Sequence, residues 1–194
     1  MNSLAQQLRQ ATRPAHQRLD RLPLLRRLLA TDLTLSHYRQ ALQTLAWLHL
    51  PLHATLTEAL TRYYPTSSYR LSPRVEWLQH DLQQLQIALP TEPPPPPPQA
   101  TSGAMVVGQI YVVEGSTLGG AVIAQAVARS LTIGPHNGGA FLHGHGAESG
   151  EAWQRFWRFA ETSCPAHESE DAVIGACKLF DYMGYLLGER DSGG

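Results

Sequence analysis

The sequence GQIYVVEGSTLGG, Gly108 to Gly120, lies within a long apolar stretch that runs from Ala104 to Leu131. If this stretch is a helix, Tyr111, Gly115 and Gly119 recur every fourth residue on one face. Each glycine inside a helix costs about 1 kcal/mol relative to alanine, so repeated glycines need a structural reason. They clear side chains from one face, and either a broad, flat group or a neighbouring helix can then approach the backbone. The sequence alone leaves both interpretations open.

The β-branched residues of Met105 to Val113 would also suit a buried strand. Every other patterned segment has helical periodicity, so an all-α fold is the simpler interpretation. The predicted helices run from Leu4 to Leu22, from Leu35 to Leu60, from Pro73 to Leu89, from Ala104 to Leu131, from Trp153 to Ala160 and from Asp171 to Leu187. Pro14 is expected to kink or restart the first helix, with Thr12 as an alternative cap, and Pro51 is expected to interrupt the second.

The chain has 194 residues, enough for one hydrophobic core, and we expect a single domain over residues 1–194. Six consecutive prolines, Pro93 to Pro98, predict a stiff polyproline connector at about residues 90–102. A proline-rich loop can also recruit a partner domain, but no recognition context flanks this one. Gly134 to Gly150 is expected to be a Gly- and His-rich loop, and Asp191 to Gly194 a frayed tail.

Charge and composition favour a folded protein in the cytoplasm. With 15 Lys and Arg against 16 Asp and Glu, the formal charge of −1 gives no reason to expect a nucleic acid or an anionic membrane as partner. The first residues are rich in arginine without an apolar segment, and no uninterrupted apolar run reaches about 18 residues, so neither a signal peptide nor a membrane span is expected. Cys164 and Cys177 lack zinc-site spacing and are expected to be reduced.

A second informative stretch is TRPAHQRLD, Thr12 to Asp20. On a helical projection Arg9, Arg13 and Asp20 fall within about 60° of His16, whereas leucines lie on its other side. An imidazole at the edge of an apolar face can ligate a metal, and a carboxylate four residues later can fix its tautomer. The arginines can bind carboxylates through two hydrogen bonds. This combination suits a metal in an apolar plate that carries acid groups, as in haem. An ordinary helix-edge histidine among surface arginines is the alternative.

Other polar residues have simpler explanations. Glu114 is the one acid of the glycine-rich segment, and we expect it to pack or pair at the helix surface rather than to carry protons. His136, His143 and His145 contain a His-x-His pair that is able to chelate a metal. No cysteine or acid with matching spacing accompanies them, so a solvated loop is the favoured interpretation.

The two motifs LRQATRPAHQRLD, Leu8 to Asp20, and YVVEGSTLGGAVIA, Tyr111 to Ala124, together resemble the bacterial haem oxygenases, including those found with bacteriophytochromes. The second half of the chain is similar as well, with Phe141 in a Gly-rich stretch, a Trp- and Phe-rich helix, and a last helix around Phe180. The resemblance implies the all-helical haem-oxygenase fold. It implies cleavage of haem by dioxygen and an external reductant, such as a ferredoxin or a flavoprotein reductase, to biliverdin, carbon monoxide and ferrous iron.

The same resemblance implies which residues bind haem. His16 would be the axial ligand of the haem iron, through a neutral imidazole, on a proximal helix. The facing distal helix would contribute Tyr111, Gly115, Gly119 and Gly120. Arg9 and Arg13 match positions that place cations toward the propionates, and Arg158 matches a further basic position on a later helix.

Ser116 departs from the pattern, because animal relatives have an aspartate there that organises water on the distal side. Ser116, helix backbone groups and ordered water would have to take that role, as in bacterial relatives that lack the aspartate. A haem-binding or haem-carrying protein without catalytic activity is therefore the main alternative. A relative of the fold that binds no haem is the third.

Overall fold

The computed structural model describes residues 3–189, and the predicted frayed tail at residues 191–194 lies outside them. Its α-helices in chain order are α1 (Leu4–Leu19), α2 (Pro23–Leu28), α3 (Leu35–Tyr63), α4 (Arg74–Gln84), α5 (Gly103–Leu131), α6 (Ala140–His143), α7 (Ser149–Ser163) and α8 (Ser169–Glu189). Short 3-10 turns occur at Gly146–Glu148 and Ala166–Glu168. Between residues 3 and 189 there is no strand, which confirms the predicted all-α class.

The two internal prolines do not break their helices. Pro14 lies inside α1 and Pro51 inside α3, so the predicted restart and interruption are wrong. Thr12 is not a cap but an interior residue of α1, where its hydroxyl donates to the Leu8 carbonyl at 2.8 Å. Both helices bury an apolar side in the core, and this packing outweighs the hydrogen bond that each proline removes.

Several predicted helix ends also move. The first predicted helix extends too far, because α1 ends at Leu19 and a separate helix, α2, begins with Pro23 in its first turn, a position that suits proline. The helix predicted from Pro73 to Leu89 ends at Gln84, and the chain then turns at Gln86 with a positive φ of 51°.

The helix α5 forms the centre of the core, so the strand alternative for Met105 to Val113 is wrong. Every residue from Ala104 to Ile110 is buried. A β-branched run remains helical when neighbouring helices cover it on all sides. By length and mean hydropathy, 1.3, α5 is also long and apolar enough to cross a membrane, and half of that window is buried inside the protein.

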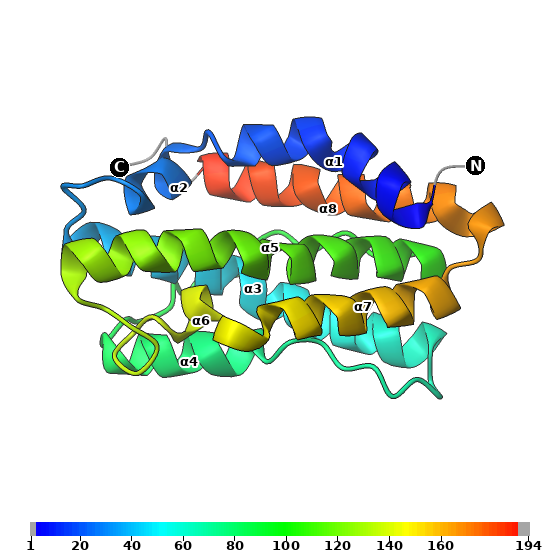
Figure 1. Ribbon diagram of the computed structural model, residues 1–194. Coiled ribbons are helices and arrows are strands. Elements are labelled where there is room, and N and C mark those ends of the chain that lie inside the picture. The colour runs from blue at the N-terminus through cyan, green and yellow to red at the C-terminus, as the bar shows by residue number, and fades with distance from the viewer. Residues whose placement is uncertain (1–2, 190–194) are drawn as a thin grey trace.

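The helix α8 packs against both α5 and α1, and Figure 1 shows it lying between them. The closest approach is at Gly108 of α5, where a Cβ atom would lie 1.8 Å from the Ala172 carbonyl oxygen. Gly175 of α8 is equally restricted, because its Cβ atom would lie 2.3 Å from the Met105 carbonyl oxygen. Only glycine allows the backbones of α5 and α8 to meet in this way.

The C-terminal half of α8 contacts α1. Arg18 of α1 donates to the Asp181 carboxylate at 3.1 Å, and both side chains are exposed. The Leu19 side chain lies 3.9 Å from the place that a Cβ atom on Gly184 would occupy. Because α8 contacts α1 and α5, it holds the two predicted haem-binding helices in one layer (Figure 1).

The proline-rich connector is bound to the helices rather than free. Its residue Pro97 is buried. Four side chains from three helices donate to its carbonyl oxygens: Trp47 of α3 to Glu92 at 2.7 Å, Tyr63 of α3 to Ala100 at 3.2 Å, Gln109 of α5 to Pro98 at 2.8 Å, and Tyr182 of α8 to Pro95 at 2.8 Å. The run therefore fastens α3, α5 and α8 together, which goes beyond the predicted role of a stiff connector.

The stretch predicted as a solvated loop, residues 134–150, is largely ordered against the core and contains α6. Asp81 of α4 is fully buried, and its two carboxylate oxygens accept the amide protons of Ala140 and Phe141 at 2.8 Å each. This carboxylate caps the N-terminus of α6. The loop interpretation is therefore wrong for this part of the stretch.

Candidate functional site

The predicted proximal residues share an exposed face of α1. Arg9, Arg13 and His16 are all exposed, and the His16 side chain retains 63% of its accessible surface. Its Nδ1 atom lies 2.9 Å from the Asp20 carboxylate, as the spacing of four predicts. Among the described residues Nε2 has no hydrogen-bond partner. The ring also lies 6.1 Å from that of Phe180 on α8, measured between centroids. His16 is thus oriented by a carboxylate and has one ring nitrogen free.

The glycine face of α5 has two different environments. Gly108 and Gly119 are eleven residues apart, which is about three helical turns, so they point to the same side about 16 Å apart. At Gly108 this side is in tight contact with α8, but a Cβ atom on Gly119 would meet nothing within 4 Å. The helices therefore separate between these positions. The two interpretations of the glycines each apply to part of the helix: helix packing at Gly108 and an open, side-chain-poor face at Gly119.

Three predicted distal residues face other helices of the protein. Tyr111 lies among the aromatic rings of α7, with its centroid 5.7 Å from that of Trp153. A Cβ atom on Gly115 would be 3.5 Å from the same tryptophan, an ordinary contact. Gly120 lies against the chain after α5, since its Cβ atom would be 3.0 Å from the Leu142 carbonyl oxygen. The structure thus brings Tyr111 and Gly115 together at α7 and leaves Gly119 as the open position.

Ser116 is half-buried and its hydroxyl donates to the Val113 carbonyl at 2.7 Å. This bond uses the only proton of the hydroxyl group, so the oxygen lone pairs remain as acceptors. In this rotamer Ser116 accepts a hydrogen bond from water more readily than it donates one.

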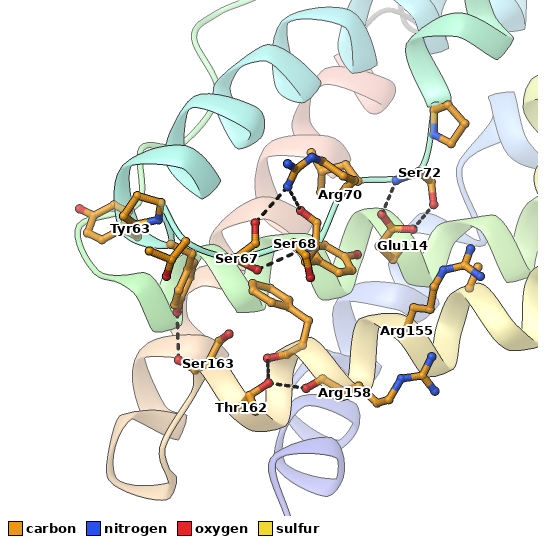
Figure 2. Close-up of a pocket in the computed structure, with 18 of the residues that line it drawn as sticks. Tyr63, Ser67, Ser68, Arg70, Ser72, Glu114, Arg155, Arg158, Thr162 and Ser163 are labelled. Carbon is orange, nitrogen blue, oxygen red and sulfur yellow. Dashed lines mark hydrogen bonds between the residues drawn. The ribbon is translucent and has the colours of Figure 1, made fainter.

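Arg158 lies on α7, away from the arginines of α1. It lines a cavity of about 860 Å³ between α7 and the segment that joins α3 to α4 (Figure 2). Its guanidinium is exposed and forms no ion pair with any described residue. The structure therefore does not bring Arg158 together with Arg9, Arg13 or His16 through a direct contact.

A buried polar cluster on the opposite side of α5 was not predicted from the sequence beyond the pairing of Glu114. The Glu114 carboxylate is buried and accepts from the Ser72 amide at 2.9 Å and also from the Ser72 hydroxyl. The Ser72 hydroxyl oxygen lies 2.8 Å from Nε2 of His145, which contradicts a solvated position for that histidine. Glu114 thus pairs as expected, but it does so in the interior, with a residue 42 positions away in the sequence.

Next to this carboxylate, Arg74 is buried with 4% of its surface exposed. Its guanidinium carbon lies 4.3 Å from the centroid of the Phe141 ring. Burial lowers the pKa of Arg74 to about 10, although the Glu114 carboxylate acts in the opposite direction. Its Nε and Nη1 atoms have no hydrogen-bond partner among the described residues. No sequence pattern indicated this cluster, because its members come from separate segments.

Three histidines near Arg74 predict a loss of stability in acid. Burial is the main reason that the pKa values of His49, His53 and His145 lie below 6.5. The Arg74 charge acts in the same direction, whereas the Glu114 carboxylate opposes it at His53 and His145. Below about pH 6.5 the unfolded chain binds protons that the folded chain does not, so the free energy of unfolding falls as the pH falls. Each histidine contributes up to about 1.4 kcal/mol per pH unit.

Urea unfolding between pH 5 and pH 8 measures this dependence. We expect nearly constant stability above pH 7 and a steady decrease below pH 6.5. The variant His145→Gln, which changes the least buried of the three histidines, should show a smaller slope than the unchanged protein. An equal slope in both proteins would contradict the assignment.

Comparison with known proteins agrees with this architecture. The family described as "Heme oxygenase" matches residues 2–91. Several solved structures that resemble this chain are also haem oxygenases. That from Leptospira interrogans has a TM-score of 0.76 and 17% identity over 97% of this chain and 100% of that one. No curated protein sequence matches the chain.

Two further structures give the same result. The NO- and CO-bound haem oxygenase from Neisseria meningitidis has a TM-score of 0.72 and 20% identity, covering 97% of this chain and 92% of that one. Haem oxygenase-1 from the cyanobacterium Synechocystis, solved in complex with haem, has a TM-score of 0.70 and 15% identity, covering 99% and 94%. At these identities the likeness defines the fold.

The chain therefore has the haem-oxygenase fold over nearly its whole length. Together with the family match over the segment that carries His16, this confirms the predicted resemblance to the haem oxygenase family.

Proposed function

We propose that this protein is a haem oxygenase that cleaves haem to biliverdin, carbon monoxide and ferrous iron. One observation carries the proposal: on α1 the His16 ring has one nitrogen oriented by Asp20 and the other free, while α5, which flanks the same helix α8, opens at Gly119. The family match and the shared fold support the same conclusion.

The residues of α1 fit haem. The bond from Nδ1 to Asp20 fixes the tautomer in which Nδ1 carries the proton, so Nε2 presents its lone pair to a metal. The carboxylate also makes the imidazole a stronger ligand. Arg13 and Arg9 lie about one and two turns before His16 and are exposed, so their guanidinium groups are free to bind propionates.

The open face of α5 would cover the other side of the porphyrin. Gly119 has no side chain there, and the exposed residues Leu118 and Val122 offer apolar surface close by. Tyr111, Gly115 and Gly120 would act behind this face, because they hold α5 against α7 and against Leu142. Arg158 would reach a propionate only if its exposed side chain turns away from the cavity that it lines.

Bound haem supplies the iron at which dioxygen and electrons react, and it is also the molecule that is cleaved. Ser116 would hold an ordered water through its free lone pairs. Dioxygen and an external donor, such as a ferredoxin or a flavoprotein reductase, complete the reaction, and we place it in the cytoplasm.

Titration with hemin, followed by addition of a reductant, tests the proposal. Binding should produce a Soret band, and ascorbate or a ferredoxin with its reductase should then convert the band into that of biliverdin. A Soret band that persists through reduction and reoxidation would instead identify a haem carrier. No Soret band would remove haem from the function altogether.

The variant Ser116→Ala tests the role of this hydroxyl. We expect the Soret band and the hemin affinity to be unchanged, because Ser116 does not touch the axial ligand. Turnover should slow by about tenfold or give a different ratio of biliverdin isomers, since one water would lose an acceptor worth about 1.4 kcal/mol. Single-turnover absorbance and chromatography of the pigment measure both. An unchanged rate with unchanged product would exclude Ser116 from the mechanism.

A further inference from the structure

The cavity that Arg158 lines lies on the side of α5 that carries Glu114. It has a volume of about 860 Å³, within the range of small-molecule sites. One wall is the segment from Tyr63 to Pro73, between α3 and α4, and the other is α7. Figure 2 shows Arg155 and Arg158 on α7, with Arg70 on the opposite wall.

The charges that line the cavity are mostly positive. Three arginines, Arg70, Arg155 and Arg158, face one carboxylate, that of Glu114. The amide and hydroxyl of Ser72 already occupy that carboxylate, and the buried guanidinium of Arg74 lies behind it. The three arginine charges on the walls are therefore only partly matched by negative charge inside the cavity.

The three arginines differ in how many hydrogen bonds and ion pairs their guanidinium groups already form within the protein. Arg70 donates to the carbonyls of Ser67 and Tyr69, at 3.0 and 2.9 Å, so it stiffens its own segment. Arg155 pairs with Glu151 at 3.2 Å, one turn back on the exposed side of α7. Arg158 has no partner among the described residues. Arg155 and Arg158 are three residues apart, so their side chains are neighbours on the helix.

Three hydroxyl groups add hydrogen-bond donors that are free to bind a ligand. Thr66, Ser68 and Ser163 line the cavity, and within residues 3–189 none of their side chains forms a hydrogen bond. Guanidinium groups together with hydroxyls are the donors that bind phosphate oxygens. A ligand whose only acidic group was a carboxylate would leave several of these donors without an acceptor.

Aromatic rings complete the walls. Tyr69 stacks on Phe159 with a centroid distance of 4.3 Å and an angle of 10° between the ring planes. Tyr64 meets the same phenylalanine edge-on at 5.3 Å, and Tyr63 also lines the cavity. Such rings offer flat surfaces against which a planar heterocycle can stack.

We propose that this cavity is a second binding site, separate from the haem face, for a ring-bearing phosphate ester such as a nucleoside phosphate. The phosphate lies between Arg155 and Arg158 and the free hydroxyls, and the ring lies against the tyrosines. The cavity contains Arg158, which the resemblance also implies for haem, and Glu114 of α5, but no residue of its wall lies on α1, and the site can be tested in the haem-free protein.

Calorimetric titration of the haem-free protein with ADP tests the proposal. We expect a dissociation constant below about 1 mM. The variant Arg155→Gln should weaken binding by about tenfold, because it removes a charge-assisted hydrogen bond. Arg158→Gln should do the same. The matched control Arg129→Gln changes an exposed arginine of α5 outside the cavity and should bind ADP as the unchanged protein does.

Adenosine and pyrophosphate separate the two halves of the ligand, and each should bind at least tenfold more weakly than ADP. Absence of heat with ADP up to several millimolar, or equal affinity in Arg155→Gln and Arg129→Gln, would overturn the site. Adenosine that binds as tightly as ADP would overturn the phosphate contacts. Because the titration contains no haem, its outcome is independent of the hemin titration.

Discussion

The variant His16→Ala is expected to lose the Soret band of the hemin complex and to bind hemin at least about a hundredfold more weakly. Partners outside the ligand shell are worth up to about that factor in metal affinity, so loss of the ligand itself should exceed it. Residual binding should come from apolar contact with the porphyrin. Because His16 is exposed and packs little, the melting temperature should hardly change.

Two controls make this result specific. The variant His167→Ala removes another exposed histidine, 80% accessible, that also lies beside a carboxylate, that of Glu168 at 3.6 Å. It should bind hemin as the unchanged protein does. Free imidazole added to His16→Ala should restore the Soret band by occupying the vacated position. If His16→Ala keeps the band unchanged, another residue is the axial ligand and the proposed site is wrong.

Replacing Gly108 with alanine should destabilise the protein by about 3 kcal/mol. The new Cβ atom would lie 1.8 Å from the Ala172 carbonyl oxygen and 2.9 Å from the Ala176 amide nitrogen, and neither backbone atom can turn away. The helices α5 and α8 would have to separate, and overpacking of this kind exceeds the roughly 1 kcal/mol that alanine gains in a helix. The melting temperature should fall by about 6–12 °C.

Gly119→Ala is the matched control, on the same side of the same helix. Its Cβ atom meets nothing within 4 Å, so only the helix propensity changes and stability should rise by about 1 kcal/mol. Thermal unfolding followed by circular dichroism measures both variants. Shifts of the same sign in the two proteins would contradict the separation of α5 from α8 between these glycines.

These two glycines also show what the sequence was able to predict. The periodicity placed both in one helix and suggested either helix packing or an open face. It did not assign one role to each, because the difference depends on where α8 crosses α5. The same holds for Glu114, which was recognised as a pairing residue. Its partner Ser72 lies 42 positions away, and no local pattern connects them.

The restart that was an alternative to a kink at Pro14, and the interruption predicted at Pro51, failed for a related reason. Local rules count the hydrogen bond that proline removes, whereas the buried faces of α1 and α3 supply more stabilisation than that bond. In contrast, the pairing of His16 with Asp20 was predictable, since both belong to one helix and the spacing of four fixes their proximity.

The bound proline run has a consequence for how sequence change can act on it. Prolines have no amide proton, so the hydrogen bonds that attach this strap are donated by side chains that reach its carbonyl oxygens from three helices. Replacement of an exposed proline by a residue that stays extended would leave these hydrogen bonds intact. Loss of Trp47, Gln109 or Tyr182 would remove one of these hydrogen bonds. The attachment of the strap is therefore more sensitive to mutation in the helices than to mutation in the strap itself.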